Sequence, residues 1–268
     1  MSLLRKELAA AHAALADPSA ALVVTGPHYE WLGRPEEARA YSDAAIAHVV
    51  KALQGGYKHP RAGRFSPSAM GRCERRIMFG YAGTPALGFD EESAEMADHG
   101  TWIHLRWQAE GITMGWMTAA EAWVEDPDLR IGGSMDGVLT DESMFEAKSA
   151  APNVYTRVVM DEKWPKPEAV FQTDTYLMLA DRDVASVVYE DRAYGNFHEF
   201  RIARNAGRER KVIAVLNRLN ALAENDELPP QLADCEIRMG RTYKECPYRK
   251  VCHKALTVSQ AATVKPGR

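Results

Sequence analysis

Residues 132–148 read Gly-Gly-Ser-Met-Asp-Gly-Val-Leu-Thr-Asp-Glu-Ser-Met-Phe-Glu-Ala-Lys, and this stretch decides the fold class. It spans most of two short apolar runs, 129–139 and 143–148, which the polar residues 140–143 separate. Short runs bounded by turn residues are typical of strands joined in a hairpin. A third run of the same kind, 120–124, precedes them. The sequence therefore predicts a three-stranded antiparallel meander in the middle of the chain.

Two carboxylates and an ammonium group are predicted to meet at the edge of this meander. Side chains two positions apart on a strand project to the same face, so Glu146 and Lys148 share a face while Ala147 faces the other layer. Asp136, on the preceding strand, then falls beside Glu146. Two carboxylates suit Mg²⁺ or Mn²⁺, and a nearby lysine can hold a phosphate oxygen or orient an attacking water. The alternative is an exposed hairpin with ordinary charges.

Helical patterns surround the predicted strands. Periodic apolar positions with proline or glycine near their ends predict helices over 2–16, 35–54, 68–81, 91–114, 153–160, 168–180 and 206–223. A loop is expected over 58–71, and two more strands over 185–190 and 197–203. This order predicts a mixed α/β (α+β) fold, in which helices flank a small central mixed sheet. From residue 229 onward no periodicity is clear, and the chain ends in a cysteine-bearing tail.

The composition is that of an ordinary globular protein, with 268 residues, 46% of them hydrophobic and 26% charged. No apolar run approaches the ~20 residues that cross a membrane, and the N-terminus lacks a signal-peptide pattern. We therefore expect a cytoplasmic protein with no membrane partner. The chain lacks G-x-x-x-x-G-K-[ST], which excludes a P-loop ATP-driven motor, and G-x-S-x-G, the commonest serine-hydrolase signature.

The basic residues are concentrated in two stretches, although the net charge is −4. Residues 58–76 and 238–254 each hold six Lys and Arg and one acidic residue. Such segregation suits a protein that presents one face to a polyanion. Two solvated basic loops are the alternative interpretation.

Two further pairs of candidate site residues lie on predicted helices, each with four-residue spacing. Gly100 and His104 share a helix face, where glycine allows close approach of another backbone and the imidazole could ligate a metal. Gln172 and Tyr176 could present an amide and a phenol to a phosphate or to a site lysine. Each pair, taken alone, is also typical of ordinary helix packing.

The four cysteines are Cys73, Cys235, Cys246 and Cys252, so three of them fall in an 18-residue window. Disulfides are not expected in a cytoplasmic chain, whereas four thiolates suit Zn²⁺ or an iron–sulfur cluster. Zinc ribbons supply C-x-x-C pairs, which are absent here, so the spacing favours iron–sulfur over zinc. Four unlinked reduced cysteines are the remaining alternative.

The order of these motifs resembles the PD-(D/E)xK nuclease superfamily, and within it the RecB-like exonucleases. The resemblance covers residues 60–254. It begins with Phe65-Ser-Pro-Ser-Ala-Met-Gly-Arg-Cys73-Glu-Arg-Arg and continues through Gly100-x-x-x-His104 and Gly132-Gly-x-x-Asp136-Gly. It then includes Glu146-Ala-Lys148, Gln172-x-x-x-Tyr176 and Cys246-Pro-Tyr-Arg-Lys-Val-Cys252. The last motif is similar to the closing cysteines of the iron–sulfur subset, which includes AddB-type nuclease domains and the small CRISPR-associated exonucleases.

The resemblance implies a role for each matched residue. His104, Asp136 and Glu146 would ligate Mg²⁺ or Mn²⁺, together with the carbonyl of Ala147. Lys148 would position or activate the water, while Gln172 and Tyr176 would support phosphate or DNA binding. The cysteines Cys73, Cys235, Cys246 and Cys252 would hold a [4Fe–4S] cluster that staples the tail to the nuclease core. The family usually pairs its middle cysteines as C-x-x-C, whereas ten residues separate Cys235 from Cys246 here.

These observations predict a metal-dependent DNA exonuclease that acts in end processing, recombination or repair. The alternatives are an endonuclease using the same site, and a catalytically silent DNA- or partner-binding subunit with a structural cluster. We expect a helical extension over 1–57, a nuclease domain over 58–254 and a tail over 255–268. DNA is the expected partner, with a helicase or a single-strand annealing protein as a further one.

Overall fold

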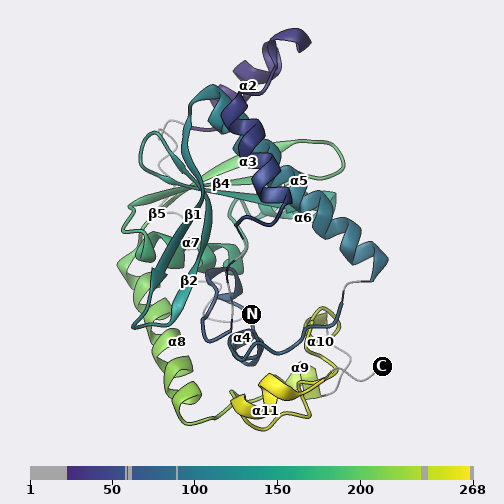
Figure 1. Cartoon of the computed structure of the whole chain (residues 1–268), viewed down its shortest axis with the longest axis vertical. Helices are drawn as coiled ribbons and strands as arrows, with labels where there is room; N and C mark the ends of the chain where they lie inside the picture. The colour runs from purple at the N-terminus through teal and green to yellow at the C-terminus, as the bar shows by residue number, and fades with distance from the viewer. Residues whose placement is uncertain (1–22, 58, 60–61, 89, 237–240, 266–268) are drawn as a thin grey trace.

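A five-stranded mixed sheet forms the centre of the protein (Figure 1). The computed structural model describes residues 23–57, 59, 62–88, 90–236 and 241–265. The strands are β1 (Met117–Asp126), β2 (Ile131–Leu139), β3 (Met144–Ala150), β4 (Val184–Asp191) and β5 (Phe197–Ala203), and they lie in that order across the sheet. Neighbours are antiparallel except β3 and β4, which are parallel. The predicted mixed α/β class and the predicted meander are confirmed.

The turn between β2 and β3 sets the register of the sheet where the candidate site lies. Leu139 N donates to Ser143 O at 2.9 Å, and Ser143 N donates to Asp141 Oδ1 at 3.1 Å. Short polar side chains that bond nearby backbone groups favour tight turns, so residues 140–143 form the predicted turn. Register then pairs Gly137 with Phe145.

Helix α5 (Glu91–Met114) covers one face of the sheet. It begins after Asp90, whose Oδ1 accepts from Ser93 N at 2.8 Å, and it ends at Gly115, which has a φ of 75°. A capping carboxylate and a left-handed glycine are typical helix boundaries, which is why the predicted range 91–114 is confirmed. Trp107 of α5 is fully buried in one core cluster with Phe145 of β3.

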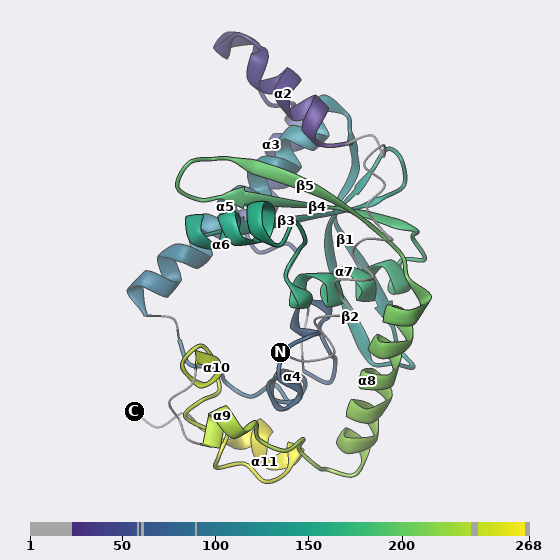
Figure 2. The same cartoon turned by 180° about the vertical axis from the view of Figure 1, so that it is seen from behind.

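Helix α7 (Pro167–Leu179) covers the opposite face, and helix α8 (Ala206–Glu224) packs against α7 (Figure 2). Parallel strands need a crossover connection, and α6 (Pro152–Thr156), the π-helical turn η3 (Arg157–Asp161) and α7 supply it between β3 and β4. The predicted helices 168–180 and 206–223 are confirmed within one residue. The single helix predicted over 153–160 is instead a short α-helix that continues into a π-helical turn.

The N-terminal region differs from the predicted single helix over 35–54. It contains α2 (Thr25–Gly33), which the sequence analysis missed, the 3₁₀ turn η1 (Glu36–Ala38) and α3 (Asp43–Leu53). The break occurs because Ser42 caps α3, with its Oγ accepting from Ala45 N at 3.3 Å. Helix α3 packs against α5. The helix predicted over 2–16 lies outside the described residues.

Glu199 of β5 anchors the start of this N-terminal region to the sheet. Its side chain is buried and accepts from the main-chain N of Val23, Val24 and Thr25 at 3.2, 3.1 and 3.0 Å. A carboxylate at the first main-chain N–H groups of α2 satisfies donors that have no partner within the helix.

The cysteine-bearing tail packs around helix α4 (Glu74–Tyr81), below the sheet in Figure 1. We call this part the lower lobe; it comprises α4 together with α9 (Ala233–Glu236), α10 (Arg241–Lys244) and α11 (Val258–Thr263). The helix predicted over 68–81 is divided, since the 3₁₀ turn η2 (Pro67–Ala69) precedes α4 and residues 70–73 between them are not helical. Phe79 of α4 stacks on Tyr248 of the tail, with ring centroids 5.3 Å apart.

Arg75 is the main polar connection inside the lower lobe. Its guanidinium donates to the carbonyls of Pro229 at 2.6 Å, Ala255 at 2.6 Å and Cys252 at 3.0 Å. The side chain is buried, so these carbonyls have few other donors. The guanidinium of Arg75 thereby binds α4 to a tail that lies far away in the sequence.

We predict that Arg75→Ala lowers the free energy of unfolding by about 2–4 kcal/mol, because it leaves buried carbonyls without a donor. Urea unfolding measures this loss. Arg218→Ala is the matched control, because Arg218 reaches the same helix through an exposed ion pair with Glu74 and is expected to cost at most about 1 kcal/mol. Equal losses in the two variants would contradict the assignment.

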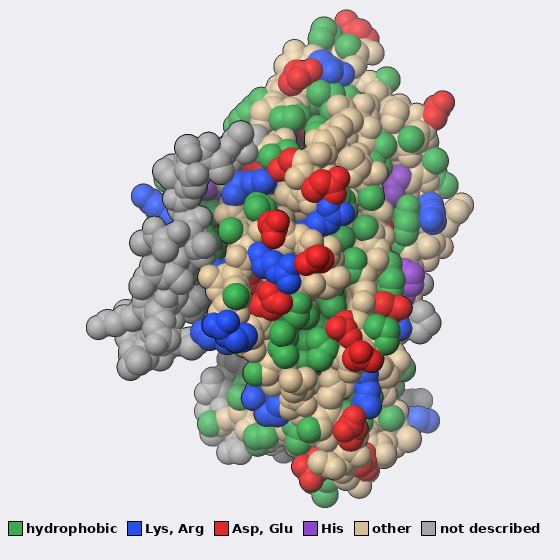
Figure 3. Space-filling model, turned by 90° about the vertical axis from the view of Figure 1, so that its left-hand side faces the viewer, with side chains coloured by type: hydrophobic (Ala, Val, Ile, Leu, Met, Phe, Trp, Pro, Cys, Tyr) green, Lys and Arg blue, Asp and Glu red, His purple; other side chains and the backbone are tan. Residues whose placement is uncertain are grey.

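Charged side chains of both signs are interspersed on the side of the molecule that carries β5 and α8 (Figure 3). Arg201 pairs with Asp141 at 2.8 Å, and Arg204 pairs with Asp181 at 2.6 Å. This face therefore presents no uniform positive surface. No helix in the described parts of the chain is long and apolar enough to cross a membrane.

Candidate active site

The candidate site lies where β2 and β3 separate. Their ladder pairing ends at Gly137 and Phe145, and the same register would next bring Asp136 opposite Glu146. Beyond that point Asp136 Oδ2 accepts a hydrogen bond from Ala147 N at 2.8 Å. Where β2 and β3 separate, the Asp136 carboxylate of β2 is thus hydrogen-bonded to the main chain of β3, as the hairpin pattern predicts.

Glu146 is buried, with 2% of its side chain exposed, and its two oxygens differ. Oε1 accepts from Lys148 Nζ at 2.6 Å and from Gln172 Nε2 at 2.8 Å. Oε2 is also buried but has no hydrogen-bond partner among the described residues. Lys148 Nζ donates to Gln172 Oε1 as well, at 2.8 Å. Three of the predicted site residues therefore form one hydrogen-bonded group.

The electrostatics of the site reflect two carboxylates held close together. Burial raises the pKa of Glu146 to about 7, with a further contribution from the negative charge of Asp136. Burial also acts to raise the pKa of Asp136, but His104, Lys148 and the main-chain N–H of Ala147 together outweigh it, and the net shift is downward. In the absence of a further cation, the site thus disfavours two ionised carboxylates.

His104 of α5 reaches the site from the other layer. Its Nδ1 lies 3.2 Å from Asp136 Oδ2. Burial acts to lower the pKa of His104, but the carboxylates of Asp136 and Glu146 outweigh it, and the net shift is upward. Its role as a metal ligand stays a prediction. Gly100, one turn earlier, does not meet a neighbouring backbone, since an added Cβ would meet only Ser149 Oγ at an ordinary 3.5 Å. The expected close backbone approach at Gly100 is wrong.

Tyr176 lies in the packing between α7 and β2. Its hydroxyl donates to Ser134 O at 2.6 Å, and only 3% of the residue is exposed. An added Cβ at Gly133 would lie 2.8 Å from that hydroxyl, so the glycine makes room for it. Tyr176 thus orients α7, which carries Gln172, and its direct contact with phosphate or DNA stays a prediction.

The carboxylates fit a hard divalent cation that keeps some of its waters. The unpartnered Oε2 of Glu146 and the neighbouring Asp136 supply anionic oxygens, which Mg²⁺ and Mn²⁺ prefer. Within the described ranges, no three His, Cys, Asp or Glu side chains form a group that could hold a metal ion. The remaining ligands would therefore be waters, the Ala147 carbonyl or oxygens of a bound phosphate.

Three residues beside the site were missed by the sequence analysis. Gln108 of α5 is fully buried, and its Nε2 donates to Glu121 Oε1 at 3.0 Å and to the main-chain O of Asp136 at 2.9 Å. Its Oε1 lies 2.9 Å from His48 Nε2 of α3. The one local signal was an acidic residue, Glu121, within the apolar run 120–124. The contacts themselves join distant parts of the sequence.

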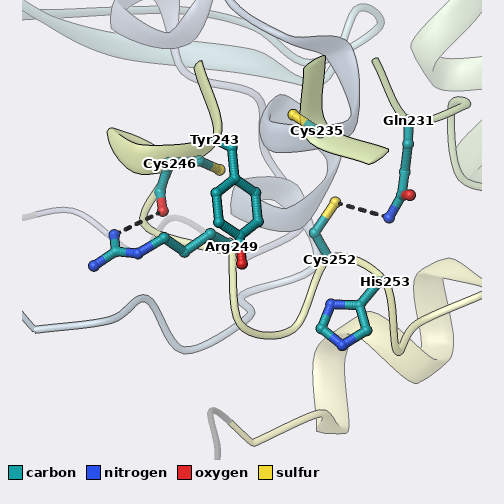
Figure 4. A pocket seen from close by; sticks show the side chains of 7 residues that line it. All are labelled: Gln231, Cys235, Tyr243, Cys246, Arg249, Cys252 and His253. Carbon is teal, nitrogen blue, oxygen red and sulfur yellow. Dashed lines mark hydrogen bonds between the residues drawn. The ribbon is translucent and has the colours of Figure 1, made fainter. Parts of the chain in front are cut away.

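The cysteines gather in the lower lobe. Cys235, Cys246 and Cys252 line a cavity of about 150 Å³ together with Gln231, Tyr243, Arg249 and His253 (Figure 4). None of the four cysteines forms a disulfide, and Cys73 immediately precedes α4. Burial raises the pKa of the Cys246 thiol, and the nearby thiols of Cys252 and Cys73 contribute to the same shift.

This arrangement places soft ligands where the tail meets α4. Thiolates bind zinc and iron–sulfur clusters, so the residue types fit the predicted group. Cys235 lines the shared cavity despite its long separation from Cys246 in sequence. The cysteines are not arranged as a metal-ready group in the described structure, and it stays a prediction that they hold a cluster or a metal ion.

Comparison with known proteins gives structural likenesses only. No protein-family model and no curated protein matches the sequence. The fold is similar to that of LHK-Exo in complex with dAMP, with a TM-score of 0.47 and 20% identity over 60% of this chain and 88% of that chain. A second structure, an alkaline exonuclease (LHK-Exo) from Laribacter hongkongensis, has a TM-score of 0.45 and 21% identity over 62% of this chain and 93% of that one.

A third similar structure is SSO0001, with a TM-score of 0.48 and 17% identity over 81% of this chain and 99% of that chain. Likenesses of this size do not carry what those proteins bind or cut over to this chain. The function proposed below is argued from the residues of the candidate site.

Proposed function

We propose that this protein is a metal-dependent DNA nuclease, and specifically an exonuclease that hydrolyses phosphodiester bonds. The observation that carries the proposal is the buried Glu146, which has one oxygen on Lys148 and the other without a partner in the described part of the chain. An unsatisfied buried carboxylate costs stability unless a ligand or ion completes it. Because the Asp136 carboxylate lies beside it, we infer that the group which completes Glu146 is a cation.

The chain's own residues would orient the reacting groups. A divalent cation on Asp136 and Glu146 would supply positive charge for the phosphate and lower the pKa of a bound water. Lys148 would hold that water or a phosphate oxygen, because its ammonium is already fixed by Glu146 and Gln172. Ala147 N and His104 would keep the Asp136 carboxylate in place.

Exposed basic side chains of the lower lobe support a DNA partner. Arg72, Lys244, Lys250 and Lys254 are exposed on or beside the cysteine-bearing tail. Cationic side chains bind the nucleic-acid backbone independently of sequence. The three residues Lys58, Arg61 and Arg238 of the two basic stretches lie outside the described residues. A helicase or an annealing protein stays a predicted further partner.

We also propose that Cys73, Cys235, Cys246 and Cys252 hold a [4Fe–4S] cluster, with zinc as the alternative occupant. The proposal is supported by three of the cysteines lining one cavity and by the nearness of Cys73 to Cys246. Such a group would join the tail to α4, where Arg75 already binds tail carbonyls. Its role would be structural.

The test offers the purified protein end-labelled linear DNA and a closed circle, each with Mn²⁺, Mg²⁺ or chelator. Metal-dependent shortening of only the linear DNA, absent in Asp136→Ala, is expected and would also reveal polarity. Cutting of the circle would make the protein an endonuclease on the same site. DNA binding without cleavage under every condition would overturn the proposal in favour of a catalytically silent binding subunit.

A second prediction concerns the cation alone. Mn²⁺ is expected to raise the melting temperature of the protein, because it binds the native carboxylates and not the unfolded chain; at 100 times Kd this is worth about 2.7 kcal/mol. Glu146→Gln should lose most of the shift, whereas Glu224→Gln, which alters an exposed ion pair with Arg130, should keep it. Equal Mn²⁺ shifts in all three proteins would show that the cation binds elsewhere.

A further inference from the structure

A second cavity, of about 450 Å³, lies between α3 and α5 next to the candidate active site. It is lined on one side by Ala52, Gly55 and Tyr57, and on the other by residues of α5 that include Thr101 and His104. Gln108 and Glu121 also line it. His104 also contacts Asp136, so this cavity adjoins the candidate active site.

The polar wall of the cavity is held rigid by a chain of hydrogen bonds. Gln108 Nε2 uses its two hydrogens on Glu121 Oε1 and the carbonyl of Asp136, so Gln108 Oε1 must accept from His48 Nε2. His48 Nδ1 is then an acceptor for the hydroxyl of Tyr57, which lies 2.9 Å away. Lys51 Nζ packs over the Tyr57 ring, 4.4 Å from its centroid. Every member of this chain is therefore oriented before a ligand arrives.

Backbone geometry at Glu121 shows that this orientation is imposed. Glu121 has a φ of 51°, a left-handed conformation that is rare for a side chain of this kind. The β1–β2 pairing is regular on both sides of it, at Ala120–Gly137 and Ala122–Met135. Backbone strain of this kind persists where the surrounding structure holds the residue in its conformation, and it is concentrated at ligand sites.

The lining residues indicate which ligand the cavity would accept. Its described lining contains one carboxylate and no lysine or arginine, so it is unsuited to a phosphate group. A carboxylate accepts hydrogen bonds, and therefore favours a ligand with N–H or O–H donors over an anionic one. The volume falls in the range of pockets that take small organic molecules, and the two glycines at its walls leave room for a flat ring.

We propose that this cavity binds the nucleoside, the base with its sugar, that adjoins the phosphate being cut, with Glu121 as the acceptor for its donors. The proposal rests on the nuclease function proposed above. It divides the nucleotide between two neighbouring sites, with the phosphate at Lys148 and the uncharged part between α3 and α5. The N-terminal region, through α3 and Tyr57, would thus form part of the substrate site.

The experiment uses the full chain carrying Asp136→Asn, so that DNA binds without being cut. Single-stranded and duplex oligonucleotides carry the fluorescent base 2-aminopurine at one end or at an internal position. Binding is expected to change the emission of a terminal probe more than that of the internal one. Thr101→Trp, which fills the cavity from an exposed position of α5, should abolish that change and weaken binding at least about tenfold.

Two variants complete the test. Asp98→Trp adds the same ring at an exposed position of the same helix outside the cavity lining, and it should behave as the parent. Glu121→Ala should weaken binding of the terminal nucleoside while leaving the Mn²⁺ shift of the melting temperature unchanged. An unaltered terminal signal and affinity in Thr101→Trp would overturn the inference. Absence of cleavage by wild-type protein, with the terminal signal present, would instead overturn only the nuclease function.

Discussion

Lys148→Ala is expected to lower the rate of DNA cleavage by about 10²–10⁴-fold, because the ammonium that touches Glu146 and Gln172 is lost. Its carboxylate partner stays in place, so cation binding should survive, and the loss should appear in kcat more than in KM. Single-turnover cleavage of labelled linear DNA with saturating Mn²⁺ measures the chemical step directly.

Lys211→Ala is the matched control, since Lys211 is an exposed lysine on α8. It should cut at the wild-type rate. Gln172→Ala should have a smaller effect than Lys148→Ala, because Gln172 orients Lys148 and Glu146 but carries no positive charge itself. Wild-type cleavage by a correctly folded Lys148→Ala protein would show that the reaction takes place elsewhere.

Cys73→Ser is expected to cause the largest structural effect. If the four cysteines bind a cluster, the variant should lose bound iron and visible absorbance, and the tail should separate from α4. A loss of about 4 kcal/mol would lower the melting temperature by roughly 10 °C in a chain of this size. Iron analysis, visible spectra and the rate of tryptic cleavage in the tail measure the three consequences.

The comparison for Cys73→Ser is wild-type protein treated with a chelator, which should reproduce the loss of the group without changing the sequence. If the wild-type protein is colourless and contains stoichiometric zinc, the four-thiolate site is correct but its occupant is zinc and not an iron–sulfur cluster. Wild-type protein with neither iron nor zinc, and a Cys73→Ser variant of unchanged stability, would contradict a structural metal group altogether.

Elements with strong local signals were predicted correctly from the sequence. Helix α5 has a capping aspartate at one end and a left-handed glycine at the other, and strand β5 was predicted with its observed bounds. The prediction of one helix over 35–54 was wrong, because Pro35 precedes only a 3₁₀ turn and Ser42 begins a new helix. Helix α2 has no side-chain cap and instead receives Glu199 from β5.

In the candidate site, too, some features follow from local sequence signals and others depend on tertiary packing. Strand alternation was sufficient to place Glu146 and Lys148 on one face, and the structure gives their contact at 2.6 Å. The two-residue period of a strand acts over a few ångströms and needs no knowledge of the rest of the chain. Tyr176 shares a helix face with Gln172, yet its hydroxyl bonds Ser134 O, because the distance from α7 to β2 depends on core packing.

Local sequence was therefore enough for the order of most elements, the hairpin turn and the carboxylate–lysine group, since short-range periodicity and capping govern them. Tertiary packing alone brings His48 to Gln108 and Glu121 to the edge of the cavity between α3 and α5. It also brings Cys73 beside cysteines more than 170 positions later, and leaves Glu146 Oε2 with no hydrogen-bond partner among the residues that the structure describes. Contacts between distant residues and the burial of single atoms depend on how whole layers pack, which no local pattern encodes.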